Sequence, residues 1–490
     1  MQLHELNIQQ AHEYLIKRKI SSEELTKTFI DRIHRLDPQL KSFVTVSEDI
    51  ALAQAKEADR RIKNHEYITP LTGIPMAVKD SISTRGVRTT CSSKILESYI
   101  PIYDATVMKL AYSAGAVLIG KTNMDEFGMG SSTENSAFFT TRNPWNLEHV
   151  PGGSSGGSAA AVSAGLSMFA LAEDTGGSVR MPASFCGVVG LKTTYGRVSR
   201  YGLLALVSSF DTIGPMTRDV MDCALVMETI AGHDPKDSTS RPEQPPKYSS
   251  VMRTDDGLKG LRLGIPKEYF AEGINGQIKQ SLLEAIKVLE RLGANIEEVS
   301  LPHTRYAIPV YYLILFAEAS SNLARYDGVR FGLSERNTGG LSEMYLRTRE
   351  AGFGAEVKRR IMLGTFALSA GYFDAYYLKA QKVRTLIRQD FEKAFENFDA
   401  LIAPVSPTPA FKIGEKIEDP LSMYLSDVHV VAVNPAGVPA LSVPCGFTND
   451  LPIGMQIIGS HLAEDKILRI GYAYQSQTDW HKQHPPCWEN

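Results

Sequence analysis

Residues 150–192, VPGGSSGGSAAAVSAGLSMFALAEDTGGSVRMPASFCGVVGLK, set the organisation of this chain. Two clusters of glycine and serine, Gly152–Ser158 and Thr175–Ser178, flank an apolar segment, Ala159–Ala172. A further apolar run, Cys186–Leu191, follows the second cluster. A flexible linker of similar composition would lack such apolar runs. The pattern therefore predicts a loop, a buried helix, a second loop, the start of a helix and a strand.

The two small-residue loops form a candidate active site. Glycine permits positive φ angles, lets the backbone approach a ligand closely and presents N–H groups that bind anions. A serine at the end of such a loop can act as a nucleophile, with neighbouring amides as its oxyanion hole. From these residues alone, close packing of a buried helix explains the small side chains equally well.

Composition indicates an ordinary globular protein. The chain has 490 residues and a formal net charge of −3, which gives no electrostatic reason to expect strong direct binding of nucleic acid. Its five cysteines show no C-x-x-C spacing, so we expect reduced thiols and no metal site. The N-terminus lacks the pattern of a secretory signal, and no apolar run is expected to span a bilayer. We therefore expect a cytoplasmic protein without a membrane segment.

Helical patterns alternate with short apolar strands along most of the chain. After a helical N-terminal region with a capping box at Ser21 and Glu24, helices are expected at about 48–62, 105–114, 219–230, 275–292, 308–326, 355–369, 374–398 and 464–478. Strands are expected at 74–78, 116–119, 262–265, 295–299, 400–403, 440–443 and 454–458. The alternation predicts one large α/β domain, residues 1–480, with a mixed, mostly parallel central sheet covered by helices on both faces. Residues 235–257 are expected to form a surface loop, and residues 481–490 a loose tail.

Two motifs match known sites without the context that those sites need. Gly115–Thr122 fits the phosphate-binding pattern G-x-x-x-x-G-K-[ST], but its four central residues are apolar and follow a helix, so they predict a strand. Gly152–Gly156 fits the nucleophile elbow G-x-S-x-G, but the proline-containing segment before it predicts a loop where that motif requires a strand.

Lys79, Ser154 and Ser178 are the candidate catalytic residues. A serine hydroxyl needs a base, and a buried lysine can act as one because burial favours the neutral amine. A second serine can relay the proton between the nucleophile and the lysine, since a hydroxyl both donates and accepts. Lys79 follows a predicted buried strand, although a solvated lysine is the commoner occupant of such a position.

Three segments that contain these residues resemble the amidase signature family. They are GIPMAVKD around Lys79, GGSSGGSAAAV around Ser154 and DTGGSVRMPASFCGVVGLK around Ser178. The resemblance extends from about residue 5 to 475. It implies that Ser178 is the acyl nucleophile, Ser154 a relay serine held by a cis peptide bond and Lys79 the base. The loop itself indicates an oxyanion hole, because Thr175, Gly176, Gly177 and Ser178 would offer consecutive backbone N–H groups to a tetrahedral oxyanion.

Other segments resemble the glutamine-hydrolysing subunits of tRNA-dependent amidotransferases within that family. They are Asn123–Ser136, Thr194–Leu203 and Glu356–Tyr372. The resemblance implies that Arg360 binds the α-carboxylate of glutamine, Asp427 its α-ammonium, and that Tyr311 lies nearby. A guanidinium suits the carboxylate because it can bind both oxygens.

Two residues depart from the pattern that the resemblance implies. Glu173 stands where a small residue is usual, and Met181 where a glutamine is common. Neither is expected to touch Lys79, Ser154 or Ser178, although either could alter the packing of the oxyanion loop.

The function implied is hydrolysis of glutamine through a glutamyl-serine intermediate, with release of ammonia. The ammonia would pass to a B subunit that binds ATP and magnesium and handles the tRNA, converting Glu-tRNA(Gln), Asp-tRNA(Asn) or both. A small C subunit would complete a heterotrimer, and this chain itself would carry no cofactor. The alternatives are a stand-alone amidase of small or aryl amides, a catalytically silent scaffold protein and a Ser-His-Asp hydrolase.

Overall fold

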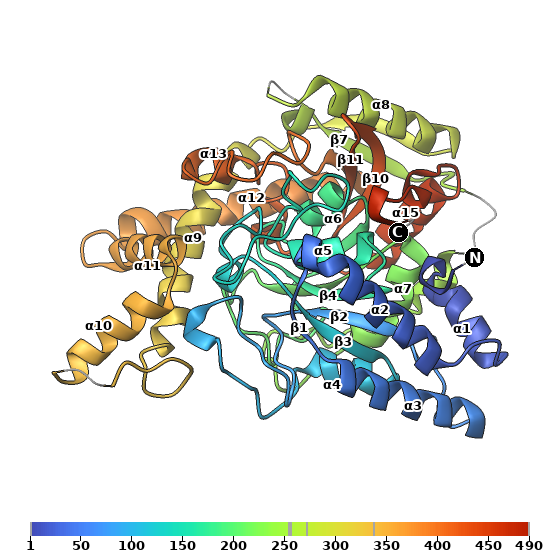
Figure 1. Cartoon of the computed structure of the whole chain (residues 1–490). Helices are drawn as coiled ribbons and strands as arrows, with labels where there is room; N and C mark the ends of the chain where they lie inside the picture. Colours follow the sequence, from blue (N-terminus) through green and yellow to red (C-terminus); the bar gives the residue numbers. More distant parts are fainter. Residues whose placement is uncertain (1, 253–256, 271–272, 337–338, 489–490) are drawn as a thin grey trace.

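An eleven-stranded sheet runs through the molecule in the order β1-β3-β2-β4-β6-β5-β10-β11-β9-β7-β8 (Figure 1). The computed structural model describes residues 2–252, 257–270, 273–336 and 339–488. The strands are β1 Phe43–Val46, β2 Pro75–Lys79, β3 Val117–Thr122, β4 Phe169–Asp174, β5 Val189–Lys192, β6 Thr212–Thr217, β7 Arg262–Pro266, β8 Asn295–Val299, β9 Ala400–Pro404, β10 Ala440–Thr448 and β11 Leu451–Gly459. The prediction of a single α/β domain with a mixed sheet is confirmed.

The expectation that the sheet is mostly parallel is wrong. Parallel pairs occur only towards the two ends, in β3-β2-β4 and β9-β7-β8, and among the described strands six of the ten pairings are antiparallel. One antiparallel pair is the hairpin β10–β11, whose turn residues Asn449 and Asp450 have φ angles of 51° and 61°. Positive φ at both central residues is typical of the tight turn that joins neighbouring antiparallel strands.

The apolar segment predicted as one buried helix contains two elements. Helix α5, Gly156–Ser163, is followed by a turn with Gly165 at φ 64° and then by strand β4. Every residue from Gly156 to Asp174 is buried. Complete burial removes the polar and apolar alternation that distinguishes a helix from a strand, so the boundary could not be placed from the sequence.

The remaining expected helices and strands are present within a few residues of their predicted bounds. The helices are α1 Ile8–Ile16, α2 Ser22–Leu40, α3 Glu48–Asn64, α4 Thr106–Ser113, α6 Arg180–Cys186, α7 Val220–Ile230, α8 Gly276–Arg291, α9 Ala307–Asn322, α10 Leu341–Gly352, α11 Ala355–Leu368, α12 Lys379–Phe395, α13 Pro420–Leu425, α14 Val433–Ala436 and α15 Glu464–Gln475. At the start of α2, the Ser21 hydroxyl accepts the Glu24 N–H at 3.0 Å, as the capping pattern predicts. Elements β1, β6, α10, α13 and α14 were not expected.

Helices cover both faces of the sheet. A Cβ placed at Gly471 of α15 would lie 2.7 Å from the side chain of Leu441, whereas one placed at Gly454 would lie 2.6 Å from Ser184 of α6 and 3.0 Å from the Ser442 hydroxyl. Leu441 and Ser442 are consecutive on β10, and successive side chains of a strand point to opposite faces. Helices α6 and α15 therefore pack on opposite sides, and α5 and α6 carry the two glycine-rich loops at their N-termini.

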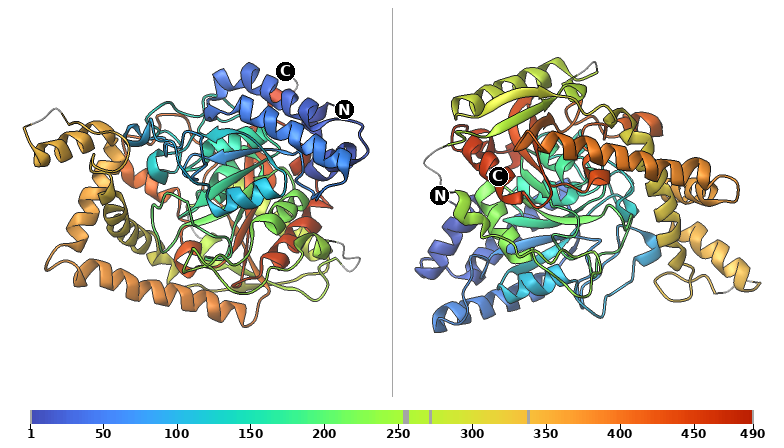
Figure 2. Two further views of the ribbon diagram at one scale, coloured as in Figure 1. Left: turned by 90° about the horizontal axis from the view of Figure 1, so that it is seen from below. Right: turned by 180° about the vertical axis from the view of Figure 1, so that it is seen from behind.

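A second group of helices lies beside the sheet. Helices α9 to α12 extend away from α1–α3, and α10 and α11 project furthest from the body (Figures 1 and 2). Among the described residues, one segment, Thr304–Arg325, is long and apolar enough to cross a membrane, which corrects the expectation that none would be. Of the window tested, 56% is buried inside the protein, as is typical of a core helix.

The C-terminal segment is less loose than expected. Trp488 is 4% exposed and lies between the side chains of His484 and His4, with ring centroids 4.0 Å and 5.1 Å away. The expected surface loop 235–257 also has a buried anchor, because the Tyr248 hydroxyl accepts a hydrogen bond from Arg197 Nε at 2.9 Å. Residues 253–256 of that loop lie outside the described part of the chain.

Candidate active site

Lys79 is the last residue of β2, and its whole side chain is buried. Its Nζ donates a hydrogen bond to the Ser154 hydroxyl at 2.8 Å and a second to the backbone carbonyl of Glu173 at 3.2 Å. A buried amine that touches a serine hydroxyl has the geometry needed to accept a proton from it. Two of the three predicted catalytic residues are therefore in direct contact.

The Ser154 loop is held from several sides. The Gly153–Ser154 peptide bond is cis, and the Asp125 amide donates to the Ser154 carbonyl at 3.2 Å. A Cβ at Gly153 would lie 2.2 Å from Asp125 Oδ2, so only glycine fits there. The Asp125 carboxylate in turn accepts the amides of Thr133 and Asn135. The segment Asn123–Ser136, singled out only by its resemblance, thus supports the predicted relay serine.

Ser178 lies in the loop next to Ser154. The Ser155 amide donates to the Ser178 carbonyl at 3.3 Å, which ties the two glycine-rich loops together. Ser178 is 7% exposed, and its hydroxyl makes no hydrogen bond within the described structure. The predicted nucleophile therefore borders solvent with its hydroxyl uncommitted, while Ser154 is engaged by Lys79.

Asp174 anchors the predicted oxyanion loop. Its carboxylate accepts the amides of Gly177 at 2.9 Å and Val179 at 3.0 Å, and it forms a bidentate ion pair with Arg180. Burial alone would raise the pKa of Asp174, but the Arg180 guanidinium outweighs it and lowers that pKa. Gly177 has φ 126°, a conformation that favours glycine. Because Asp174 occupies the Gly177 amide, the other amides of the loop are the better candidates for binding an oxyanion.

Tyr311 of α9 borders this loop, and Arg360 lies on the neighbouring helix α11. A Cβ at Gly176 would lie 2.3 Å from the Tyr311 hydroxyl, so Tyr311 covers the loop. Arg360 is 3% exposed, and its Nε donates to Glu356 at 2.7 Å. Its guanidinium lies 5.5 Å from the Tyr312 ring centre and 5.3 Å from that of Tyr424. Its two terminal nitrogens have no hydrogen-bond partner in the described structure and can bind a carboxylate.

Asp427 carries the carboxylate predicted for the substrate ammonium. Its Oδ2 accepts the Tyr312 hydroxyl at 2.8 Å and the Ser131 hydroxyl at 2.9 Å. Its Oδ1 accepts no hydrogen bond from the described residues. Burial raises the pKa of Asp427 to about 7. Sequence reasoning missed Tyr312, although its position next to Tyr311 on a helix that borders the site was visible.

The Glu173 side chain lies closer to the catalytic residues than the sequence predicted. Its carboxylate Oε2 lies 3.6 Å from Lys79 Nζ, so the prediction that this departure would not touch the catalytic residues is wrong. Met181 is buried in a separate apolar cluster with Val150, Phe185 and Val430. Glu173 is the last but one residue of β4, which pairs in parallel with β2, and this pairing brings the two side chains together.

The rejected motifs are explained by the structure. Lys121, the lysine of the phosphate-loop match, is buried at the end of β3 and donates to the hydroxyls of Thr84 and Thr89. Burial lowers the pKa of Lys121 to about 8, and its hydrogen bonds fix the loop after β2. No described histidine hydrogen-bonds to Ser154 or Ser178, so the Ser-His-Asp alternative has no support. In the described residues no three His, Cys, Asp or Glu side chains gather as metal ligands would.

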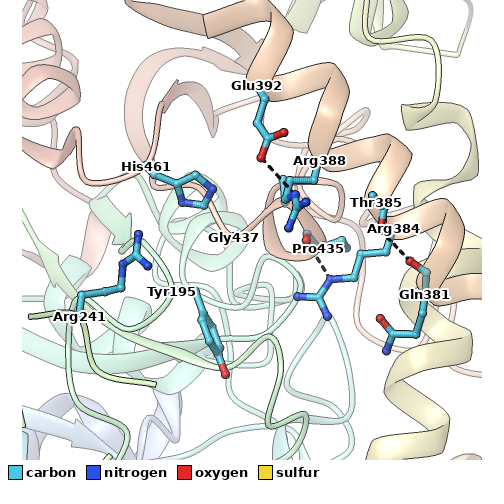
Figure 3. A pocket seen from close by; sticks show the side chains of 11 residues that line it. Tyr195, Arg241, Gln381, Arg384, Thr385, Arg388, Glu392, Pro435, Gly437 and His461 are labelled. Carbon is cyan, nitrogen blue, oxygen red and sulfur yellow. Dashed lines mark hydrogen bonds and ion pairs between the residues drawn. The ribbon is translucent and has the colours of Figure 1, made fainter. Parts of the chain in front are cut away.

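A separate pocket of about 500 Å³ lies beside α12 (Figure 3). Its lining includes Arg384 and Arg388 of α12, with Arg388 paired to Glu392. Arg384 lies 4.8 Å from the ring centre of Phe210, which stacks on Tyr311 with centroids 5.8 Å apart. The lining contains none of the predicted catalytic residues.

Comparison with known proteins agrees with this geometry. The family model described as Amidase matches residues 24–468. The glutamyl-tRNA(Gln) amidotransferase A chain of Thermoanaerobacter pseudethanolicus is 58% identical over 475 residues, 97% of each protein. The protein of the same name from Carboxydothermus hydrogenoformans is 58% identical over 485 residues, 99% of this chain and 100% of its own. This chain belongs to the amidase family.

Solved structures support the same assignment. The crystal structure of the corresponding glutamyl-tRNA(Gln) amidotransferase protein from Thermotoga maritima superposes with a TM-score of 0.81 at 46% identity, covering 98% of this chain and 96% of that one. A bacterial aryl acylamidase of the amidase signature family superposes with a TM-score of 0.85 at 25% identity, covering 98% of each chain. The fold is thus shared by amidases of different substrates, so the substrate must be argued from the site.

Proposed function

We propose that this chain is the glutamine-hydrolysing subunit of a tRNA-dependent amidotransferase. The observation that carries the proposal is the 2.8 Å hydrogen bond between Lys79 and Ser154, beside the uncommitted hydroxyl of Ser178. Arg360 and Asp427 favour glutamine over a simple amide, because a free amino acid presents one carboxylate and one ammonium group. The two amidotransferase relatives at 58% identity support the same choice.

The reaction uses the three residues in sequence. Ser178 attacks the side-chain carboxamide carbon of glutamine while its proton passes through the Ser154 hydroxyl to the Lys79 amine. Amides of the Thr175–Ser178 loop stabilise the tetrahedral oxyanion. Its collapse breaks the C–N bond, and the proton returns from Lys79 to the leaving nitrogen as ammonia. Water then hydrolyses the glutamyl-Ser178 ester by the same relay and releases glutamate.

The partners follow from the class of reaction. Ammonia becomes useful only where a carboxylate has been activated, and we expect that step on a B subunit that binds ATP, magnesium and the mischarged tRNA. A small C subunit would complete the heterotrimer. A net charge of −3 is consistent with the tRNA being held mainly by the partner.

The test is ammonia release from glutamine by the purified chain, alone and with its partner subunits. We expect turnover that rises with partners and is lost in Ser178→Ala. An aryl amide serves as the control substrate, because the fold is shared with an aryl acylamidase. Rapid aryl amide hydrolysis without glutamine turnover in any mixture would instead assign a stand-alone amidase.

A further inference from the structure

Glu173 places a carboxylate beside the predicted base. Its Oε2 lies 3.6 Å from Lys79 Nζ and accepts the Ser81 hydroxyl at 2.7 Å. Its Oε1 is buried and has no hydrogen-bond partner among the described residues. The side chains of Lys79 and Glu173 are 0% and 2% exposed, so solvent does not screen their interaction. A buried carboxylate left partly unsatisfied at this position costs stability, which points to a role in the chemistry.

Other titratable groups lie around this pair. Burial and the Glu173 carboxylate raise the pKa of Asp211 well above its ordinary range, and Asp211 accepts the Thr175 hydroxyl at 2.8 Å and the Val207 amide at 3.1 Å. Burial also raises the pKa of the Cys91 thiol, which stays neutral. Asp125, under the Ser154 loop, has a pKa raised by burial to about 6 and is charged above that pH. Glu173 is the carboxylate that pairs with Lys79.

We propose that Glu173 is a positioning residue that stabilises the Lys79 ammonium formed when Ser178 gives up its proton. The proposal rests on the proposed function only in taking Lys79 as the base. The proton leaves the Ser178 hydroxyl, reaches Lys79 through Ser154, and the resulting ammonium faces an existing negative charge. Charge separation across the site is thereby reduced, because the positive charge forms next to the Glu173 carboxylate.

This arrangement has a definite consequence for the reaction rate. The Glu173 carboxylate lies 3.6 Å from Lys79 Nζ and stabilises the positive charge that forms there during the reaction. Replacing Glu173 by an uncharged residue of the same size removes this stabilisation. We therefore expect Ser178 to react more slowly in such a variant, by about tenfold or more.

The experiment measures the rate of Ser178 phosphonylation by a fluorophosphonate probe in the full chain. The probe forms a bond from Ser178 Oγ to phosphorus and expels fluoride, with the proton passing to Lys79, so no glutamine is needed. Variants are Glu173→Gln, which keeps size and an acceptor for Ser81, and Glu173→Asp, which keeps the charge. Glu464→Gln, a buried carboxylate that accepts the Thr194 amide away from the site, is the matched control.

We expect labelling to be slower in Glu173→Gln than in the wild type, with Glu173→Asp between them and Glu464→Gln unchanged. Labelling in Glu173→Gln as fast as in Glu173→Asp would overturn the proposal, because size and not charge would then matter at this position. Thermal melting shows whether Glu173→Gln is folded, and if it is not, a wild-type labelling rate in Glu173→Asp would overturn the proposal. Glutamine hydrolysis by the assembled complex, measured in parallel, tests the proposed function separately, because the probe labels Ser178 whatever the natural substrate.

Discussion

Asp427 shows how burial prepares a single side chain for a charged substrate. Its pKa is raised to about 7 by burial, and only its ionised form can bind the ammonium of glutamine. As the pH falls below 7, the Asp427 carboxylate becomes protonated, and each further pH unit lowers the ionised fraction roughly tenfold. We therefore expect KM for glutamine to rise roughly tenfold for each pH unit below 7, because only the ionised fraction binds substrate. Initial rates of ammonia release between pH 6 and 8.5 measure this.

The Tyr312 hydrogen bond provides the control for that prediction. It lowers the pKa of Asp427, so Tyr312→Phe should move the midpoint of the KM profile to higher pH. Asp427→Asn should raise KM and remove the pH dependence. A KM that stays constant from pH 8.5 to 6 in the wild type would exclude Asp427 from the ammonium site.

We expect Ser154 to affect the rate of glutamine hydrolysis strongly and the binding of glutamine little. Ser154→Ala removes the acceptor of the Lys79 hydrogen bond and breaks the proton path to Ser178. We expect kcat to fall by about 10²–10⁴, the usual contribution of a positioned proton-transfer group, with KM changed little. Steady-state kinetics on the assembled complex measures both constants, and a kcat close to that of the wild type would mean that Lys79 does not act through this hydroxyl.

The oxyanion loop depends on one buried ion pair between β4 and α6. Asp174 binds Arg180 through two N–H···O contacts of 3.1 Å, and both side chains are fully buried. Asp174→Asn leaves the guanidinium without its charge partner, so we expect a loss of about 3–5 kcal/mol in the free energy of unfolding. Urea unfolding measures it. Glu13→Gln, which breaks an exposed ion pair with Lys17, should change nothing measurable, and equal effects from the two variants would contradict the argument.

Local patterns in the sequence predicted most elements, and they failed at the boundary between α5 and β4. The strands β7, β8 and β9 and the helices α7, α8 and α15 agree with their expected positions to within a few residues. In α8 and α15 an exposed side produces the period that reveals a helix. Strand β4 was absorbed into a predicted helix because all its residues are buried. The direction of strand pairing depends on contacts between distant segments, which local patterns do not show. For this reason the prediction of a mostly parallel sheet was wrong.

The sequence predicted which residues form the candidate site, but not which of them contact one another. Lys79, Ser154 and Ser178 were identified from three separate segments, and the structure brings the first two together. The contact of Glu173 with Lys79 depends on the parallel pairing of β2 with β4, which no local pattern reveals. Asp174, although adjacent in sequence to Thr175, was missed as the anchor because its partner amides lie three and five residues further on.

Trp488 brings the N-terminal and C-terminal segments of the described chain into contact. Its ring packs on His4 and His484, and the guanidinium groups of Arg32 and Arg218 lie 5.7 Å and 5.4 Å from its centre. We expect Trp488→Ala to destabilise the protein by about 3–5 kcal/mol, as for other large buried aromatic residues. Thermal and urea unfolding measure it, and an unchanged stability would mean that the C-terminal segment does not contribute to the fold.

The most direct test of the whole account is to trap the acyl-enzyme. The assembled complex is mixed with isotopically labelled glutamine, quenched in acid within one turnover and digested for peptide mass analysis. We expect a γ-glutamyl ester on Ser178, in the peptide that contains Thr175–Ser178, and its absence from Ser178→Ala. Ammonia release that persists in Ser178→Ala, or a glutamyl group on another residue, would contradict it.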